Sequence, residues 1–263
     1  MHCIVVPNEY LLNPDARPLG PDAAHHLRDV MRARPGDEVS LVDGRGARRT
    51  ARVSGASRSE IRLEGVGGVE TEPRPSPQIT LFQCVAKPSR MDWLLEKAVE
   101  TGVFRIVPVV SSRVVSRIAP GERPVRWQRI VDAALGQCGS AWGPELAPAV
   151  SWAEAMERIA AFPGFVFAGA LSEGAPPVAR AMAEKFGGAG AAENVDGELP
   201  VGWAIGPEGD FSPEELRQAA ALPNVVPVSL GPRILRVETA AVFAVAVTMA
   251  LLGPRAGNNM REA

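Results

Sequence analysis

Charged side chains gather in two short segments near the C-terminal end of the chain, 206–211 and 230–239. Each segment follows a short apolar run and opens a helical pattern. The charged side chains in the two segments are Glu208, Asp210, Arg233, Arg236 and Glu238. A carboxylate can accept a proton or orient a neighbour, and a guanidinium can stabilise a developing anion. The two segments therefore predict two walls of one pocket.

The first segment has the features of a tight loop before a helix. Gly206 and Gly209 allow a close backbone approach or a positive φ. Ser212 can cap the next helix, Pro213 suits its first position, and Glu215 completes a capping box. An ordinary connection between a strand and a well-capped helix remains the alternative for this segment.

The second segment stands at the entrance to a helix, 240–247, that is apolar on every face and is expected to be buried. Two arginines and a glutamate at the entrance of a buried helix need partners or a ligand. A structural Arg–Glu pair is the alternative. The segment carries neither the dinucleotide-binding glycine pattern nor the Walker lysine, so no motif supports a dinucleotide or ATP.

The elements that must position these segments follow a proline-rich spacer, 72–77, which favours an extended linker. After it, the predicted strands are 79–85, 105–110, 165–170, 201–205 and 225–230, and the predicted helices are 91–101, 127–138, 213–221 and 238–252. Residues 187–197 form a predicted surface loop. This alternation indicates a mostly parallel sheet with helices on its faces, an α/β fold.

The residues before the spacer predict a small β-rich module. The predicted strands there are 39–44, 49–53 and 60–64, and residues 23–31 form a predicted helix. The predicted domains are therefore 1–72 and 73–263, which is compatible with a chain of 263 residues.

Composition excludes several classes of protein. Hydrophobic residues make up 46% of the chain, which indicates a globular protein. The longest apolar stretch, 240–252, is too short to span a bilayer, and residues 1–7 do not resemble a signal peptide, so we expect a cytoplasmic protein. Three separated cysteines and three histidines show no metal-binding spacing, and we expect neither a disulfide framework nor a metal site.

Charge is distributed unevenly along a chain whose net charge is −2. Residues 45–62 and residues 105–129 each hold six arginines against one glutamate. Such local patches can follow RNA phosphates even on a mildly acidic protein. A solvated arginine-rich surface is the alternative interpretation.

Taken together, the two segments have a familiar pattern. Gly-Pro-Glu-Gly at 206–209, followed by Leu-Gly-x-Arg-Ile-Leu-Arg-x-Glu-Thr-Ala at 230–240, resembles the SPOUT-class methyltransferases. More closely, it resembles the bacterial family that methylates N3 of a uridine in 16S ribosomal RNA. Residues 25–37 resemble the N-terminal PUA-like module of that family, and residues 87–103 and 127–139 resemble its helices. The resemblance covers nearly the whole chain.

The resemblance implies an N-terminal small β-barrel (PUA-like) module and a C-terminal SPOUT α/β domain with a deep trefoil knot. It implies S-adenosylmethionine as cofactor, a homodimer, and 16S rRNA in the assembled small ribosomal subunit as substrate. The implied cofactor-binding residues are Leu171, Ile205, Gly206, Pro207, Gly209, Leu230, Gly231, Ile234, Leu235 and Thr239. The implied RNA-binding residues are Arg28, Arg32, Arg45, Arg48, Arg113 and Arg126.

In the implied reaction, Arg236 or Arg233 stabilises a uracil anion, and Glu208 or Glu238 acts as the base or orients those arginines. Two positions depart from the family pattern. Asp210 stands where the family usually has glycine, and Ser140 stands where it often has arginine.

Two other functions remain open at this stage. One is a non-catalytic RNA-binding protein that retains the methyltransferase shape, which a titration with S-adenosylmethionine would distinguish. The other is an α/β enzyme for a small phosphorylated substrate, with the arginines as a phosphate clamp. The proline-linked β module with its basic stretch speaks against the second, because such an enzyme has no evident need for it.

Overall fold

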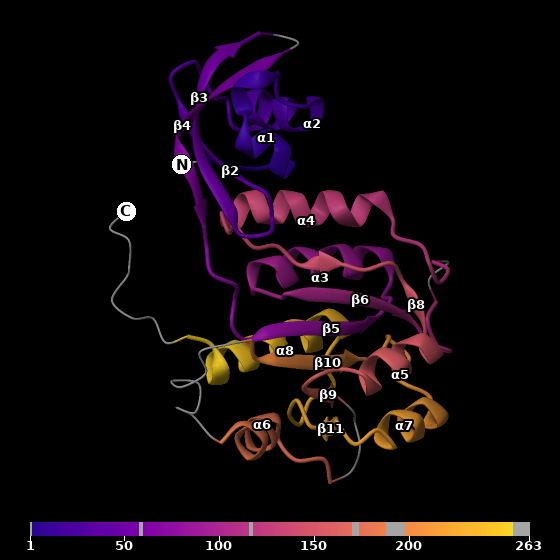
Figure 1. The fold of residues 1–263 in the computed structure, drawn as a ribbon. Helices are drawn as coiled ribbons and strands as arrows, with labels where there is room; N and C mark the ends of the chain where they lie inside the picture. Colours follow the sequence, from indigo (N-terminus) through magenta and orange to yellow (C-terminus); the bar gives the residue numbers. More distant parts are fainter. Residues whose placement is uncertain (1, 58–59, 116–117, 170–173, 188–197, 255–263) are drawn as a thin grey trace. The chain divides into compact units, whose positions relative to one another are not determined.

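Two compact units make up the chain in the computed structural model (Figure 1). The first unit contains residues 1–74 and 128–143, and the second contains residues 75–127 and 144–263. The structure describes residues 2–57, 60–115, 118–169, 174–187 and 198–254. Leu171 and all but the first residue of the predicted loop 187–197 therefore lie outside the described residues.

The first unit is built on a four-stranded sheet with the order β1-β2-β3-β4. The strands are β1 (His2–Val5), β2 (Glu38–Val42), β3 (Ala47–Ala56) and β4 (Ile61–Thr71). β1 pairs with β2 in parallel, and the other two pairs are antiparallel. The three strands predicted here are confirmed in position, while β1 was not predicted.

Short helical segments accompany this sheet. They are α1 (Asn8–Leu12), a 3-10 turn (Pro14–Ala16), α2 (Pro21–His25) and a π-helical turn (His26–Val30). The single helix predicted over 23–31 is therefore two segments of different pitch. Tyr10 lies in the core of this unit at 3% exposure, and among the described residues its hydroxyl has no hydrogen-bond partner. Burial raises the pKa of Tyr10 to about 12.

The second unit is a seven-stranded parallel sheet with the order β11-β9-β10-β5-β6-β7, in which β8 also pairs with β6. The strands are β5 (Gln78–Cys84), β6 (Arg105–Val110), β7 (Glu145–Leu146), β8 (Val150–Ser151), β9 (Phe165–Gly169), β10 (Pro200–Ile205) and β11 (Val225–Val228). The helices are α3 (Pro88–Glu100), α4 (Val125–Cys138, mostly in the first unit), α5 (Trp152–Ala160), α6 (Val178–Phe186), α7 (Pro213–Ala220) and α8 (Val237–Leu252). The predicted parallel α/β sheet is confirmed.

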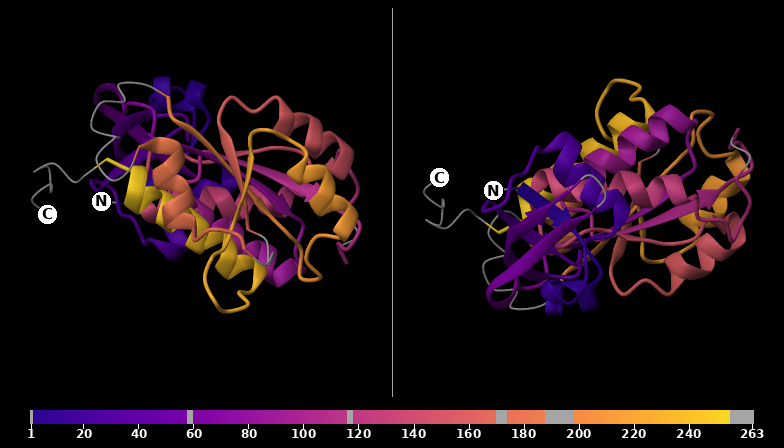
Figure 2. Two further views of the ribbon diagram at one scale, coloured as in Figure 1. Left: turned by 90° about the horizontal axis from the view of Figure 1, so that it is seen from below. Right: turned by 90° about the horizontal axis from the view of Figure 1, so that it is seen from above.

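Helices lie on both sides of the parallel sheet (Figure 2). Alternate strand residues point to opposite faces. Phe82 and Ala204 lie in the core on the side of α5 and α7. Trp203 points to the other side, where its indole nitrogen donates to the Thr248 hydroxyl of α8 at 2.9 Å. Both faces are therefore buried, as parallel sheets require.

Helix α8 is less buried than the sequence predicted. Its apolar sequence predicted burial on every face, but only one side packs against the sheet and α3. Phe243 is 40% exposed, and Ala246 and Ala250 are exposed on the same side. Apolar composition all around the helix cannot tell which face meets this chain's own core.

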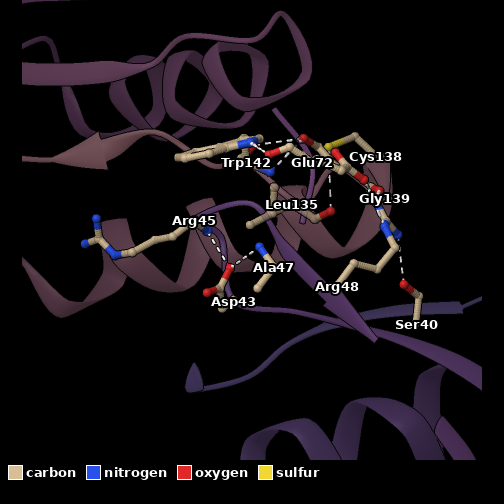
Figure 3. A network of polar contacts seen from close by, with 11 residues as sticks. Ser40, Asp43, Arg45, Ala47, Arg48, Glu72, Leu135, Cys138, Gly139 and Trp142 are labelled. Carbon is tan, nitrogen blue, oxygen red and sulfur yellow. Dashed lines mark hydrogen bonds and ion pairs between the residues drawn. The ribbon is translucent and has the colours of Figure 1, made fainter. Parts of the chain in front are cut away.

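Residues 128–143 group with the first unit, although the predicted domains 1–72 and 73–263 are continuous in sequence. The indole nitrogen of Trp142 donates to the Glu72 carbonyl at 3.1 Å, and Arg48 donates to the Gly139 carbonyl at 2.7 Å (Figure 3). These hydrogen bonds tie the end of α4 to the β-sheet of that unit. In the described parts of the chain, no helix is long and apolar enough to cross a lipid bilayer.

Candidate active site

A cavity of about 530 Å³ lies in the second unit, where the loops after four neighbouring strands meet. Carboxyl ends of parallel strands share one edge of a sheet, so loops from β11, β9, β10 and β5 converge there. The volume lies in the range of sites for small molecules and cofactors. The lining residues are Arg90, Gly169, Ile205, Gly206, Pro207, Glu208, Asp210, Ser229, Leu230, Gly231, Arg233, Ile234, Leu235, Arg236, Val237 and Ala240.

The cavity brings together most of the residues predicted for the site. Seven predicted cofactor residues line it, namely Ile205, Gly206, Pro207, Leu230, Gly231, Ile234 and Leu235. Of the predicted catalytic residues, Arg233, Arg236 and Glu208 line it as well. Gly209 lies in the first loop, and Glu238 and Thr239 lie in the first turn of α8, but none of the three is among the lining residues. The two walls expected from the sequence thus face one cavity.

The first wall is a tight turn with a left-handed residue. The amide of Asp210 donates to the Pro207 carbonyl at 2.9 Å, and Asp210 has φ of 58°. Aspartate is one of the few residues besides glycine that adopts this conformation readily. Its carboxylate accepts the amide of Phe211 at 2.7 Å. A positive φ is compatible with glycine, which the resemblance led us to expect here, and with the aspartate that occupies the position.

Arg113, which follows β6, stabilises this turn through a hydrogen bond to its backbone. Its guanidinium donates to the carbonyl of Gly209 at 2.8 Å, and a Cβ added at Gly209 would lie 3.4 Å from the Arg113 Cβ. The arginine stem therefore packs over the glycine. Arg113 was predicted to contact RNA, and the structure gives it a second task, which is to hold the loop.

The start of α7 follows the prediction. Ser212 and Glu215 form the expected capping box. The buried Glu215 carboxylate also accepts the amide of Ser112, after β6, at 2.8 Å. Burial by itself would raise the pKa of Glu215, but the hydrogen bonds from Ser112 and Ser212 outweigh it and hold the pKa below its ordinary value.

The second wall, residues 229–236, presents its charges outward. Gly231 has φ of 118°, and its amide donates to the Ser229 hydroxyl at 3.2 Å. Arg233 and Arg236 are exposed, and among the described residues neither guanidinium has a hydrogen-bond or ion-pair partner. Both are available to an anionic ligand.

Arg90 is a site residue that the sequence reasoning missed. Its Nη1 lies 3.2 Å from Glu208 Oε1, and its Nε lies 4.0 Å from Glu238 Oε2. The backbone amide of Lys87 donates to Glu208 Oε1 as well, at 3.0 Å. The Arg–Glu pair considered for the second loop therefore exists, but Arg90 supplies its arginine. The position of Arg90 just after β5, next to β10, is the signal that could have found it.

Arg48 is engaged within the first unit. Its guanidinium donates to Glu72 at 2.9 and 2.8 Å, to Ser40 at 2.8 Å and to the Gly139 carbonyl at 2.7 Å (Figure 3). Its side chain is 16% exposed. Figure 3 shows the exposed Arg45 pointing away from this network. The structure thus gives Arg48 a packing role, and the RNA contacts of both arginines stay predictions.

The other predicted RNA-binding arginines lie at surface positions. Arg28 pairs with Asp29 at 2.8 Å, and Arg126 donates to Asp92 at 3.2 Å. Exposed ion pairs of this kind are weak, so they compete little with a phosphate. Arg32 adopts a positive φ of 55°.

Ser140 stands where the resemblance led us to expect arginine. Its hydroxyl donates to the Trp142 carbonyl at 2.9 Å and accepts the Trp142 amide at 3.1 Å. The short side chain closes a local turn, which positions the Trp142 ring. Serine at this position therefore serves the local fold of residues 139–143.

Comparisons with known proteins identify the class to which the chain belongs. Residues 72–249 match the model of an RNA methyltransferase domain, and residues 19–64 match the model of an RNA methyltransferase PUA domain. Together with the cavity at the strand ends, the two matches define the class as RNA methyltransferases that carry a PUA domain.

The individual relatives show which family within this class the chain matches. The ribosomal RNA small subunit methyltransferase E of Mycobacterium tuberculosis is 30% identical over 235 residues, which cover 85% of this chain and 82% of the relative. The protein of the same name from Synechocystis is 29% identical over 230 residues, covering 87% and 71%. The chain belongs to the ribosomal RNA small subunit methyltransferase E family.

Solved structures show the same fold. A ribosomal RNA small subunit methyltransferase E from Neisseria gonorrhoeae, bound to S-adenosyl methionine, has a TM-score of 0.77 and 29% identity, covering 96% of this chain and 98% of that one. A methyltransferase structure from Legionella pneumophila, in complex with its bound cofactor SAM, has a TM-score of 0.78 and 27% identity, covering 95% and 97%.

Proposed function

We propose that this protein transfers a methyl group from S-adenosylmethionine to N3 of a uridine in 16S ribosomal RNA. The observation that carries the proposal is the cavity at the strand ends, where predicted cofactor residues and two exposed arginines meet. Family membership and the cofactor named for the Neisseria gonorrhoeae relative support it. They favour it over the non-catalytic protein and over the phosphate-clamp enzyme.

The residues of the cavity suit this cofactor. Apolar side chains of Ile205, Leu230 and Leu235 can enclose an adenine ring, and glycines permit close backbone contact. A Cβ added at Gly169 would lie 3.2 Å from the Leu230 side chain, so glycine there leaves room for Leu230 in the wall. When bound, S-adenosylmethionine supplies a methyl group already activated by the sulfonium.

The exposed arginines act on the nucleotide. N3 of uracil is a weak nucleophile until its proton is lost, and a cation beside the base stabilises the anion that results. We assign this role to Arg236, at the N-terminus of α8, and phosphate binding to Arg233. Holding N3 in line with the methyl–sulfur bond supplies the rest through proximity.

We assign different roles to the two carboxylates, Glu208 and Glu238. Glu208 Oε1 already accepts hydrogen bonds from Lys87 and Arg90, so we assign Glu208 to orientation of the loops. Glu238 Oε2 is buried and has no hydrogen-bond partner among the described residues. Because no hydrogen bond holds this buried oxygen, and Glu238 directly follows the lining residues Arg236 and Val237, we assign it the N3 proton.

The substrate context rests on the family and on the surface of the chain. The target uridine must leave its stack to reach the cavity, and the arginine-rich module holds the RNA backbone. The assembled small subunit, and with it a cytoplasmic location, is the proposed setting. We also propose a homodimer, since two large apolar side chains, Phe243 of α8 and Trp93 of α3, are 40% and 42% exposed in one chain.

The test separates binding from catalysis. We expect Arg236→Ala to bind S-adenosylmethionine like the wild type in calorimetry, yet to lose transfer of labelled methyl to undermethylated small subunits. Full activity of the variant would exclude the catalytic role of Arg236. Ribosomal RNA from a strain lacking the protein should lack one 3-methyluridine by mass spectrometry. Absence of cofactor binding by the wild type would favour the non-catalytic alternative.

A further inference from the structure

A second cavity, of about 450 Å³, lies entirely within the first unit. It opens between β1, α2 and the part of α4 that belongs to this unit. Its lining residues are Cys3, Ile4, Val5, Asp22, Ala23, His25, His26, Arg129, Asp132, Ala133 and Gly136. The proposed methyl transfer uses none of these residues.

Two features of the backbone in the first unit border this cavity. A Cβ added at Gly136 would lie 3.0 Å from the Cys3 carbonyl oxygen, so the glycine lets α4 approach β1 closely. Just after α2, the amide of Met31 donates to the His26 carbonyl at 3.0 Å, which closes the π-helical turn. Turns of this kind are rare and frequently mark functional sites.

The polar groups of the cavity form an unusual combination. Asp132 is partly buried, and its carboxylate accepts Gln128 Nε2 at 2.9 Å. Burial raises the pKa of Asp132, and the hydrogen bond from Gln128 only partly offsets it. Arg129 lies 3.9 Å from Asp22 in an exposed pair, so its planar guanidinium is weakly held.

An acceptor, a planar cation and two imidazoles are the groups with which proteins read unstacked RNA bases. Bases stack on His rings or Arg planes, and side chains bond their Watson–Crick edges. A carboxylate accepts only, and it can accept two parallel N–H groups. Guanine presents two neighbouring N–H donors on that edge, whereas adenine and cytosine present an amino group alone and uracil an imide N–H alone.

We propose that this cavity binds an unstacked guanine of the RNA substrate, with Asp132 accepting its two N–H donors and His25, His26 or Arg129 stacking on the ring. The volume is in the range that admits a nucleotide-sized ligand. This inference rests on the proposed function for the presence of RNA, but it concerns a site separate from the methyl-transfer cavity. The guanine would fix the register of the RNA rather than react.

The test uses guanosine monophosphate as probe with the full chain. In nuclear magnetic resonance titrations we expect it to shift the amides of Ala133 and Gly136, more strongly than the other three nucleotide monophosphates do. Asp132→Asn keeps the shape and the acceptor for Gln128, and we expect it to weaken guanosine monophosphate binding about tenfold. Ala133→Trp should block the cavity, because Ala133 is exposed and lines it.

Two matched variants control the experiment. Glu9→Gln removes one exposed carboxylate of the same unit, and Gln137→Trp adds the same ring to α4 at a position outside the cavity lining. Both should bind like the wild type. Equal shifts with all four nucleotides, no shifts at millimolar probe, or unchanged binding by Asp132→Asn would each overturn the proposal.

The nucleotide titration tests this proposal independently of the assay for methyl transfer. The titration requires no methyl transfer, so failed methylation with intact guanosine monophosphate binding would refute only the methyltransferase proposal. Normal methylation without guanosine monophosphate binding would refute only this one.

Discussion

The backbone amide of Lys87 donates to Glu208 Oε1 at 3.0 Å, so a single carboxylate oxygen joins the loop after β5 to the loop after β10. Arg90 reaches the same oxygen at 3.2 Å. The glutamate of the Gly-Pro-Glu-Gly turn is therefore a connection between two walls of the cavity. Because Glu208 lies near the proposed cofactor site, loss of this connection should change the affinity for the cofactor, which can be measured.

Glu208→Gln should weaken cofactor binding. Glutamine still accepts the Lys87 amide but removes the negative charge beside Arg90, and hydrogen bonds to charged groups contribute about 1.5–3 kcal/mol. We expect S-adenosylmethionine affinity to fall about tenfold, measured by calorimetry. Glu208→Ala should lose more, and an alanine variant with wild-type affinity would contradict the role of this oxygen. Glu96→Gln, on the exposed surface of α3, is the matched control.

Glu215→Gln should destabilise the protein in a pH-dependent way. The folded pKa of Glu215 lies below its ordinary value of 4.5, so its contribution is complete above that value and is lost as pH falls through the folded pKa. At neutral pH we expect a loss of about 1–3 kcal/mol in urea unfolding. The difference between wild type and variant should shrink as pH falls below 4.5. A constant difference across that window would show that the carboxylate charge is not involved.

Thr248→Val should leave the Trp203 indole without an acceptor. Trp203 and Thr248 are both 0% exposed, and a buried donor without a partner costs about 1–3 kcal/mol. Valine has nearly the shape of threonine, so packing changes little. Thr248→Ser keeps the hydroxyl and should retain most of the stability in the same denaturation experiment. Equal losses in both variants would indicate packing as the cause.

Asp210→Gly should be tolerated, while Asp210→Ala should not. Residue 210 has φ of 58°, which costs most residues with a Cβ about 1–2 kcal/mol. Both variants lose the hydrogen bond that the Asp210 carboxylate accepts from the Phe211 amide, but only alanine also bears that cost. We expect Asp210→Ala to lower thermal stability and cofactor affinity more than Asp210→Gly does. Reversal of this order would contradict the backbone explanation.

Local features of the sequence predicted the structure best. The capping box of Ser212 and Glu215 formed as expected because all its partners lie within one helical turn. The same signal at Ser151 and Glu154 marks α5, a helix that was not predicted although its capping box is present in the sequence.

Contacts between distant segments could not be predicted from single-chain patterns. Arg90 and Glu208 are 118 positions apart, and only the order of β5 and β10 in the sheet brings them together. The helix at 127–138 was recognised, but periodicity does not say which unit it joins. The trefoil knot and Leu171 remain expectations that derive from the resemblance.

Tyr10 can serve as an intrinsic absorbance probe for the folding of the first unit. It is the one tyrosine of the sequence, and the five tryptophans do not ionise in the alkaline range. Because burial raises its pKa to about 12, tyrosinate absorbance should stay low in mild alkali while the first unit is folded. A rise in that absorbance at lower pH would then report, without any attached dye, that the N-terminal core has opened.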